Sequence, residues 1–153
     1  LPGLISYVAP PGGGTTDYAV EIFHHAMRYG KYSCFLAADS QLDMMYMPDA
    51  IRAMSELMEA APGQLTVRNA YNVTAMSITP RDLAAAIAQH MPEFNISYDV
   101  DPVRQSIADS WPRSVDDSQA RQDWGWQPAY DLQTMTADML EKLAQPGSST
   151  SAT

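Results

Sequence analysis

A glycine loop, two threonines and a distant tryptophan are the residues of this sequence best suited to hold a small polar molecule. The glycines at 12–14 allow a backbone to approach a ligand closely. Thr15 and Thr16 offer hydroxyl groups where a helix should begin, and free N–H groups at a helix start suit a carboxylate or a hydroxyl group. Trp111 offers a flat apolar wall. These residue types suit a ligand site, but a plain helix cap for the threonines and a core position for Trp111 are the simpler interpretations of the residues alone.

Residues for proton transfer are harder to find in this chain. None of the eight tyrosines is followed four residues later by lysine, so a Tyr-x-x-x-Lys pair is absent. The sequence begins at Leu1 without methionine, in an apolar stretch typical of the end of a buried strand. We therefore expect the chain to be part of a longer protein, with its acid–base residues encoded elsewhere.

Composition excludes several classes of partner. The 153 residues suffice for one domain, and the formal charge of -9 would repel the phosphate backbone of a nucleic acid. No apolar run approaches the roughly 20 residues of a membrane helix, which predicts no membrane contact. The single Cys34 stands in an apolar run, where a buried thiol and a reducing compartment are expected. We expect a cytoplasmic location, or the mitochondrial matrix for a eukaryotic parent.

Prolines, glycines and helix-capping residues divide the first half of the chain into elements. Thr15 and Thr16 can cap a helix that ends near Gly30. Residues 32–37 form a short apolar run, which predicts a strand buried on both faces. A second helix should begin at Pro48, because proline lacks only an N–H group that the first turn does not use. We expect its apolar face to consist of Ile51, Met54 and Met58.

The second half shows the same alternation. Residues 70–73 predict a strand, and Thr79 can cap a helix that closes before Pro92. Residues 94–100 alternate between apolar and polar, as a half-buried strand does. A short helix should follow, ending at Gly125. The last helix should begin after Asp131 and carry an apolar stripe of Leu132, Met135, Met139 and Leu143.

These elements predict an α/β fold. Strands separated by helices favour a mostly parallel sheet covered on its faces, and the helix-rich second half favours a smaller α+β lobe. Both parts are assigned to residues 1–145. Residues 146–153, a proline followed by a Gly/Ser/Thr tail, carry too little apolar surface to offset ordering entropy, and we expect them to be disordered.

Four segments carry a resemblance to a known family. Their order and spacing resemble those of L-threonine 3-dehydrogenases of the extended, epimerase-like short-chain dehydrogenase family, and the similarity runs from residue 1 to about residue 144. On this resemblance, the chain corresponds to the C-terminal half: the end of a Rossmann-type sheet plus a small substrate-binding lobe. The segments are PGLIS at 2–6, GGGTTDYA at 12–19, MYMPDA at 45–50 and SWPRS at 110–114.

The resemblance implies NAD-dependent oxidation of L-threonine at its 3-hydroxyl group to 2-amino-3-oxobutanoate. Family members bind NAD in an N-terminal half that also contains the catalytic tyrosine and lysine, and they are usually homodimers. The present chain would then supply pocket walls and would be inactive alone, with the missing N-terminal half as its partner. The glycines at 12–14 lack the G-x-G-x-x-G spacing of a phosphate loop and are better interpreted as a flexible lip over the substrate.

The resemblance also assigns roles to individual positions. It implies substrate contact for Gly14, Thr15 and Thr16, and it implies that Trp111 closes the pocket around the threonine methyl group. It implies no catalytic residue in this chain. Adjacent His24 and His25 would point about 100° apart on a helix, which argues against a metal site. The positions implied to meet the nicotinamide carboxamide through their backbone are Pro2, Gly3, Leu4 and Ile5.

Simpler interpretations stay open for the same residues. Thr15 and Thr16 could be plain helix caps, and Trp111 could be a core residue packed on Trp124 or Trp126. The function also has alternatives. A sugar-nucleotide epimerase or dehydratase relative would line a long cleft with Arg104 and Arg113, whereas a non-catalytic binding module would lack the tyrosine and lysine altogether.

Overall fold

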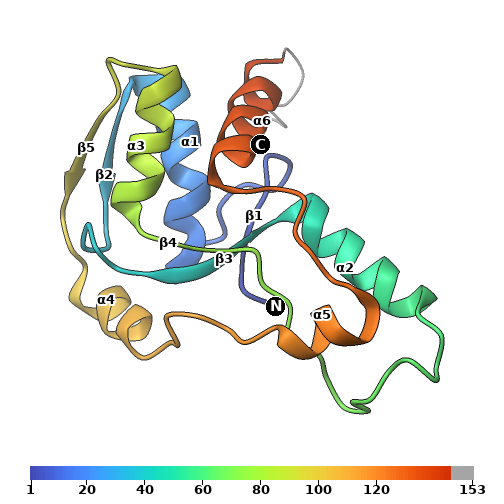
Figure 1. Cartoon of the computed structure of the whole chain (residues 1–153). Coiled ribbons are helices and arrows are strands. Elements are labelled where there is room, and N and C mark those ends of the chain that lie inside the picture. Colours follow the sequence, from blue (N-terminus) through green and yellow to red (C-terminus); the bar gives the residue numbers. More distant parts are fainter. Residues whose placement is uncertain (146–153) are drawn as a thin grey trace.

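The computed structural model describes residues 1–145, so the tail expected to be disordered lies outside the described residues. Five strands in this part form two sheets (Figure 1). In the first sheet, β3 (Leu42–Tyr46) lies between β1 (Gly3–Ile5), which is parallel to it, and β4 (Met76–Ile78), which is antiparallel. In the second, β2 (Lys31–Cys34) pairs in parallel with β5 (Asn95–Tyr98).

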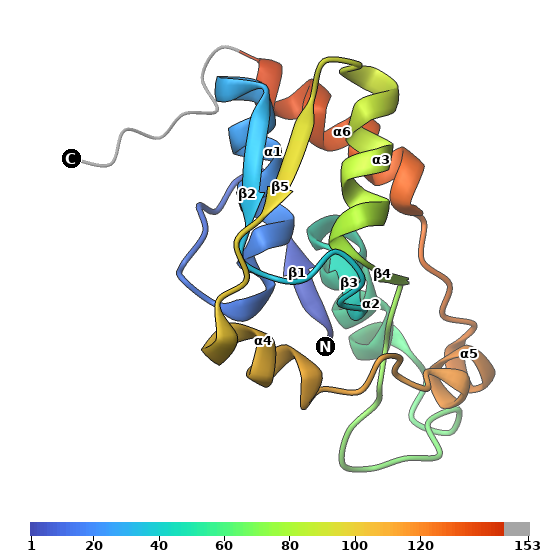
Figure 2. The ribbon, with the colours of Figure 1, turned by 90° about the vertical axis from the view of Figure 1, so that its left-hand side faces the viewer.

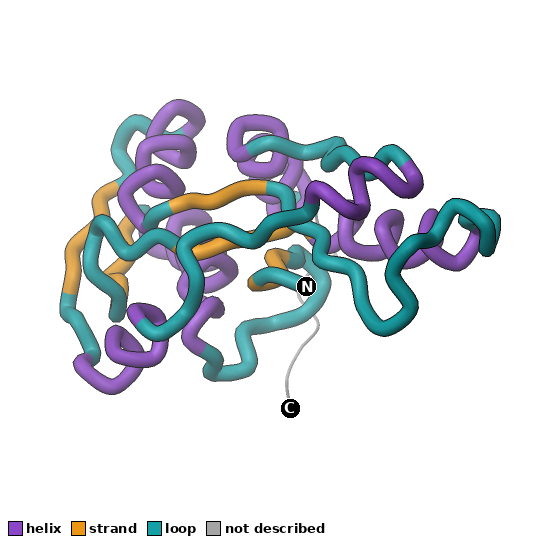
Figure 3. The backbone as a smooth tube through the Cα atoms, turned by 60° about the horizontal axis from the view of Figure 1, so that its bottom comes forward, coloured by secondary structure: helices purple, strands orange, loops and turns teal. Residues whose placement is uncertain are grey.

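Helices lie behind the strand pair β2–β5 in Figure 2, and Figure 3 shows helices and strands in separate colours. Three of them, α1, α3 and α6, pack against one another over the main hydrophobic core, which includes Ile5, Phe23 and Met139. A smaller cluster around Met45 and Trp126 lies under α2 and α5. The helices are α1 (Tyr18–Tyr29), α2 (Met47–Glu59), α3 (Pro80–His90), α4 (Pro102–Asp109), α5 (Ser118–Trp124) and α6 (Leu132–Ala144), with a 3-10 turn, η1 (Thr15–Asp17), before α1.

Four helix ends follow the sequence closely, whereas the predicted threonine cap of the first helix is wrong, because Gly14 and Asp17 hold the cap positions of η1 and α1. The side chains of Thr79 and Asp82 form the expected reciprocal cap of α3, with hydrogen bonds of 3.0 and 3.1 Å. Asp131 accepts the N–H of Thr134 at 2.8 Å at the start of α6. Gly30 and Gly125 end α1 and α5 in the left-handed conformation, with φ of 68° and 76°. These four predicted boundaries are confirmed because their signals are local.

Strands differ more from the predictions. The fully buried strand β3 was not predicted. The strand predicted at residues 70–73 is wrong, because the chain becomes a strand only at β4, which begins at Met76. β2 ends at Cys34 and alternates between exposed and buried residues, so burial on both faces is wrong for it. The strand predicted at 94–100 is confirmed as β5, which is shorter and mostly exposed. Strand pairing decides these outcomes, and pairing partners are distant in sequence.

The apolar face predicted for α2 is wrong. Ile51, Met54 and Met58 are each at least half exposed, and α2 instead buries Asp49, Ala50 and Ala53 against the rest of the described chain. Small side chains let α2 approach the sheet closely, which leaves its larger apolar residues on the outer side. This helix therefore presents an uncovered apolar stripe.

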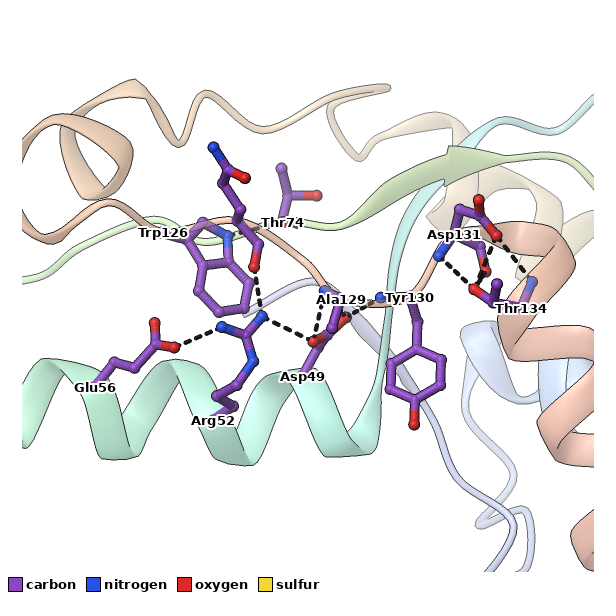
Figure 4. A network of polar contacts seen from close by, with 10 residues as sticks. Asp49, Arg52, Glu56, Thr74, Trp126, Ala129, Tyr130, Asp131 and Thr134 are labelled. Carbon is purple, nitrogen blue, oxygen red and sulfur yellow. Dashed lines mark hydrogen bonds and ion pairs between the residues drawn. The ribbon is translucent and has the colours of Figure 1, made fainter.

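A buried carboxylate fastens α2 to the segment before α6 (Figure 4). Asp49 is 1% exposed and accepts the backbone N–H groups of Ala129 and Tyr130 at 2.9 to 3.0 Å. Arg52 contacts Asp49 at 3.0 Å, hydrogen-bonds to the carbonyl oxygen of Gln127 and lies 4.8 Å from the ring centre of the buried Trp126. We call this set the Asp49 clasp.

Two further predictions concern single features. Cys34 is fully buried as expected, and burial raises the pKa of its thiol to about 11. Across residues 1–145, none of the helices combines the length and the apolar character needed to cross a membrane.

Candidate functional site

A cavity of about 400 Å³ lies where β1, η1 and the segment after α4 meet. Its volume falls in the range typical of small-molecule sites, roughly 300 to 1,000 Å³. Most of its lining is apolar, with one hydroxyl group and one carboxylate among the side chains. The lining residues are Leu1, Pro2, Gly3, Leu4, Thr16, Leu42, Asp43, Trp111, Pro112 and Val115.

Gly3 permits the close contact between β1 and η1 that forms one side of the cavity. A Cβ atom at this position would lie 2.5 Å from Sδ of Met44 and 2.7 Å from Cγ2 of Thr16. Both distances are well inside van der Waals contact, so only glycine fits without a shift. The backbone of β1 and the side chain of Thr16 are thereby brought to the same cavity.

The glycine loop before η1 is held by Asp17. The Oδ2 atom of Asp17 accepts the backbone N–H groups of Gly13 and Gly14 at 2.5 and 2.7 Å. Gly13 has a φ of 96°, a conformation that glycine adopts without strain. The carboxylate of Asp17 therefore holds the glycine loop, predicted to be a flexible lip, against the turn that follows it.

Trp111 reaches the cavity from the segment that leaves α4. The residue is 43% exposed, and its backbone N–H donates to the carbonyl of Ala108 at 3.1 Å. The alternative of a core tryptophan packed on the other two indoles is not what the structure shows. Trp124 instead makes an edge contact with Tyr71, with the two ring centres 4.8 Å apart, and Trp126 lies beneath Arg52.

Two strands anchor the segment that follows Trp111. The hydroxyl of Ser77 in β4 donates to the carbonyl of Arg113 at 2.5 Å. The carboxylate of Asp43 in β3 accepts the N–H of Val115, also at 2.5 Å. The position of the indole over the cavity therefore depends on residues of the sheet.

The structure brings together five of the eight residues to which the resemblance assigned a role: Pro2, Gly3, Leu4, Thr16 and Trp111. The other three lie outside the cavity lining. Ile5 is fully buried in the main core, Thr15 is buried in η1, and Gly14 is exposed at the start of η1. The turn of η1 explains the difference between the threonines, because consecutive side chains of a helical turn point in different directions.

Asp43 is a cavity residue that the sequence did not reveal. It is 8% exposed and, among residues 1–145, is the only residue with an ionisable side chain in the lining. An acidic residue inside an apolar strand is unusual, and that is the signal that could have drawn attention to it. Because no tyrosine, lysine, histidine or cysteine lines the cavity, the described residues can bind and orient a substrate but offer few groups for proton transfer.

The arginines named for the sugar-nucleotide alternative lie elsewhere. The guanidinium of Arg104 stacks 4.1 Å from the ring centre of Phe35 and approaches Asp101 at 3.9 Å. Arg113 lines a neighbouring cavity of about 270 Å³ together with Asp39 and Asp109. Two acidic side chains beside one arginine do not favour a diphosphate.

Comparison with known proteins gives close matches to part of longer chains. No family model matches the sequence. The chain is 57% identical over 143 residues to an uncharacterized epimerase/dehydratase of Staphylococcus saprophyticus, covering 94% of this chain and 45% of that protein. It thus spans less than half the length of this curated relative.

Solved structures agree with the sequence match. An L-threonine dehydrogenase from Clostridium difficile is 55% identical with a TM-score of 0.92, covering 94% of this chain and 45% of the other. The apo form of a GalE-like L-threonine dehydrogenase from Cupriavidus necator is 58% identical with a TM-score of 0.89, covering 93% of this chain and 51% of the other. An NAD-dependent NDP-hexosamine 5,6-dehydratase, 10% identical at a TM-score of 0.64, shares the fold alone.

The fold is therefore that of the C-terminal part of an extended short-chain dehydrogenase, as the sequence predicted. Within that class, the chain is similar to the C-terminal part of epimerase-like L-threonine dehydrogenases. This confirms the resemblance found in the four sequence segments.

Proposed function

We propose that the protein containing this chain is an NAD-dependent L-threonine 3-dehydrogenase. It would oxidise the 3-hydroxyl group of L-threonine and release 2-amino-3-oxobutanoate. The observation that carries the proposal is the convergence of Pro2, Gly3, Leu4, Thr16 and Trp111 on one cavity, since these residues come from three separated segments. The similarity to L-threonine dehydrogenases over 93 to 94% of this chain supports it.

The residues of β1 fit a nicotinamide group. Gly3 has no side chain, and its closely packed surroundings leave no room for one, so residues 2–4 can offer their backbone to a flat carboxamide. When bound, NAD accepts the hydride that leaves the hydroxyl-bearing carbon of the substrate. The family assigns the phosphate loop and the catalytic tyrosine and lysine to the other half of the protein.

The remaining lining would orient the substrate. The hydroxyl group of Thr16 can hydrogen-bond to a polar group of L-threonine, and Trp111 can cover its methyl group and exclude water. Burial of one methyl group contributes on the order of 1 kcal/mol, which favours threonine over serine. Alignment of the reacting carbon with the acceptor is the catalytic contribution that we assign to this chain.

A second candidate function is that of an epimerase or dehydratase, which the name of the curated relative suggests. Such an enzyme would need cations for the diphosphate of a sugar nucleotide. Arg104 and Arg113 lie outside the cavity, so we rank this function below threonine oxidation. Incubation with NAD and a UDP-sugar tests it, and epimerised or dehydrated product would reverse the ranking.

The wider context of the activity is also proposed. The half of the protein that this chain lacks would pack beside it and contribute NAD binding, and the whole protein would form a homodimer. A location in the cytoplasm, or in the mitochondrial matrix for a eukaryotic parent, stays a prediction from the sequence.

The activity is tested with the full-length protein, NAD and L-threonine, by following NADH formation. We expect Thr16→Ala and Trp111→Ala each to lower kcat/KM by about tenfold or more, because each removes a contact to the bound substrate. Val103→Ala, an exposed apolar residue on α4, serves as the control and should leave kcat/KM unchanged. Unchanged kcat/KM in both cavity variants would contradict the assigned site.

A further inference from the structure

One oxygen of the Asp43 carboxylate is fully engaged and the other is not. Oδ2 accepts the N–H of Val115 at 2.5 Å and the hydroxyl of Thr74 at 3.1 Å. Among residues 1–145, no donor hydrogen-bonds to Oδ1, and no lysine, arginine or histidine forms an ion pair with this carboxylate. A carboxylate that is 8% exposed and lacks a cation is costly to bury.

The unpaired oxygen faces accessible space. Oδ1 is not among the fully enclosed polar atoms that lack a partner, and Asp43 lines the cavity that contains Thr16 and Trp111. Every other side chain that the described residues contribute to the lining is uncharged. A single negative charge in a mostly apolar cavity attracts a cation strongly, because little solvent screens it.

We propose that Asp43 binds the α-ammonium group of the substrate through Oδ1 and thereby selects amino alcohols over simple alcohols. This inference rests on the proposed function and deepens it, since L-threonine carries an ammonium group on the carbon next to its hydroxyl-bearing carbon. An ammonium group offers three donors to an oxygen that has none, and the pair neutralises the buried charge.

The proposal gives the cavity three different contacts. Thr16 supplies a hydroxyl group, Trp111 an apolar wall and Asp43 a negative charge, and they come from η1, the segment after α4 and β3. Three contacts of different chemistry fix the orientation of a chiral substrate. Such contacts distinguish the enantiomers of threonine, because mirror-image molecules do not place the same three groups in the same way.

Asp43 also has a structural role, and the two roles can be separated. Its Oδ2 atom holds Val115 and so helps to position the segment that carries Trp111. Asparagine retains an oxygen that can accept the hydrogen bonds of Val115 and Thr74, but it carries no charge. Asp43→Asn therefore removes the ammonium contact while retaining the anchor.

The experiment uses the full-length protein and two substrates, L-threonine and 3-hydroxybutyrate, which lacks the ammonium group. We expect Asp43→Asn to lower kcat/KM for L-threonine on the order of 100-fold, mainly through KM, and to leave kcat/KM for 3-hydroxybutyrate within about twofold. Asp116→Asn is the matched control, because this exposed carboxylate lies outside the cavity lining. Asp116→Asn should leave kcat/KM unchanged for both substrates.

Calorimetric binding of L-threonine and 3-hydroxybutyrate to the NAD-bound protein supplies a readout independent of turnover. Wild type should bind L-threonine more tightly, and Asp43→Asn should abolish the difference. Equal losses for both substrates, or no loss for either, would overturn the role of Asp43 even in an active threonine dehydrogenase. A protein without threonine oxidation that still binds L-threonine through Asp43 would refute the proposed function alone. Absence of L-threonine binding to wild type would refute both.

Discussion

Two buried aspartates lie six positions apart on one strand–helix unit, and their surroundings differ sharply. Asp49 accepts two backbone N–H groups and an arginine, so both of its oxygens are engaged (Figure 4). Asp43, which lines the cavity, has one engaged oxygen and one without a hydrogen-bond partner among residues 1–145. A buried charge that the protein satisfies internally is costly to remove because its partners lose their contacts, whereas one left half-satisfied is available to a ligand.

We expect the Asp49 clasp to contribute to the free energy of unfolding. In the full-length protein, Asp49→Ala would leave Arg52 and the N–H groups of Ala129 and Tyr130 without their partner, and we expect the free energy of unfolding to fall by about 3 kcal/mol. Urea unfolding measures this change. Asp43→Asn should lower the same quantity by less than about 1 kcal/mol, since its hydrogen bonds survive. Equal losses would erase the distinction between the two carboxylates.

A smaller effect is expected at the cavity itself. Gly3→Ala forces Thr16 or Met44 to shift, and displacement of a substrate-positioning group can lower rates substantially. We expect kcat/KM for L-threonine to fall roughly 30-fold and stability by about 1 to 2 kcal/mol. Gly12→Ala is the matched control, because a Cβ atom there would meet only Asp17 Oδ2, at 3.9 Å. Full activity of Gly3→Ala would show that the close contact is dispensable.

The smallest effect extends the comparison to a third engaged carboxylate, Asp123. Hydrogen bonds from the hydroxyl of Tyr71 and the backbone N–H of Thr66 lower the pKa of Asp123 to about 2. Because the folded pKa lies below the ordinary value, the stability from Asp123 is present above about pH 4 and is lost as pH falls toward 2.

Melting temperatures of wild type and Asp123→Asn test this pH dependence. We expect wild type to melt higher at pH 6 and the gap to narrow steadily between pH 4 and pH 2. A gap that is constant with pH would mean that the charge of Asp123 contributes nothing to stability.

Sequence reasoning succeeded where the determining interactions are local. Thr79, Asp131, Gly30 and Gly125 set helix ends within a few residues, and all four were predicted. The pair of sheets, by contrast, depends on contacts between distant segments. Strand β3 lacks alternation because it is buried throughout, so its sequence resembles a core segment of either kind.

The candidate site divides in the same way. Thr16 and Trp111 could be named from the resemblance, but only the fold brings them to one cavity. Asp43 and the tie between Asp17 and the glycine loop escaped prediction because both depend on where a side chain points. The prediction that α2 packs through its apolar stripe is wrong, because the sequence pattern shows which residues share a face of the helix but not which face the rest of the chain covers.

The unequal surroundings of the three indoles have an optical consequence. Trp126 is fully enclosed and Trp124 packs on Tyr71, whereas Trp111 is 43% exposed at the mouth of the cavity. A soluble quencher such as acrylamide should therefore quench the fluorescence of Trp111 at lower concentrations than that of the other two tryptophans. In the full-length protein, an added amino acid that protects the emission of Trp111 from the quencher would report that the cavity is occupied.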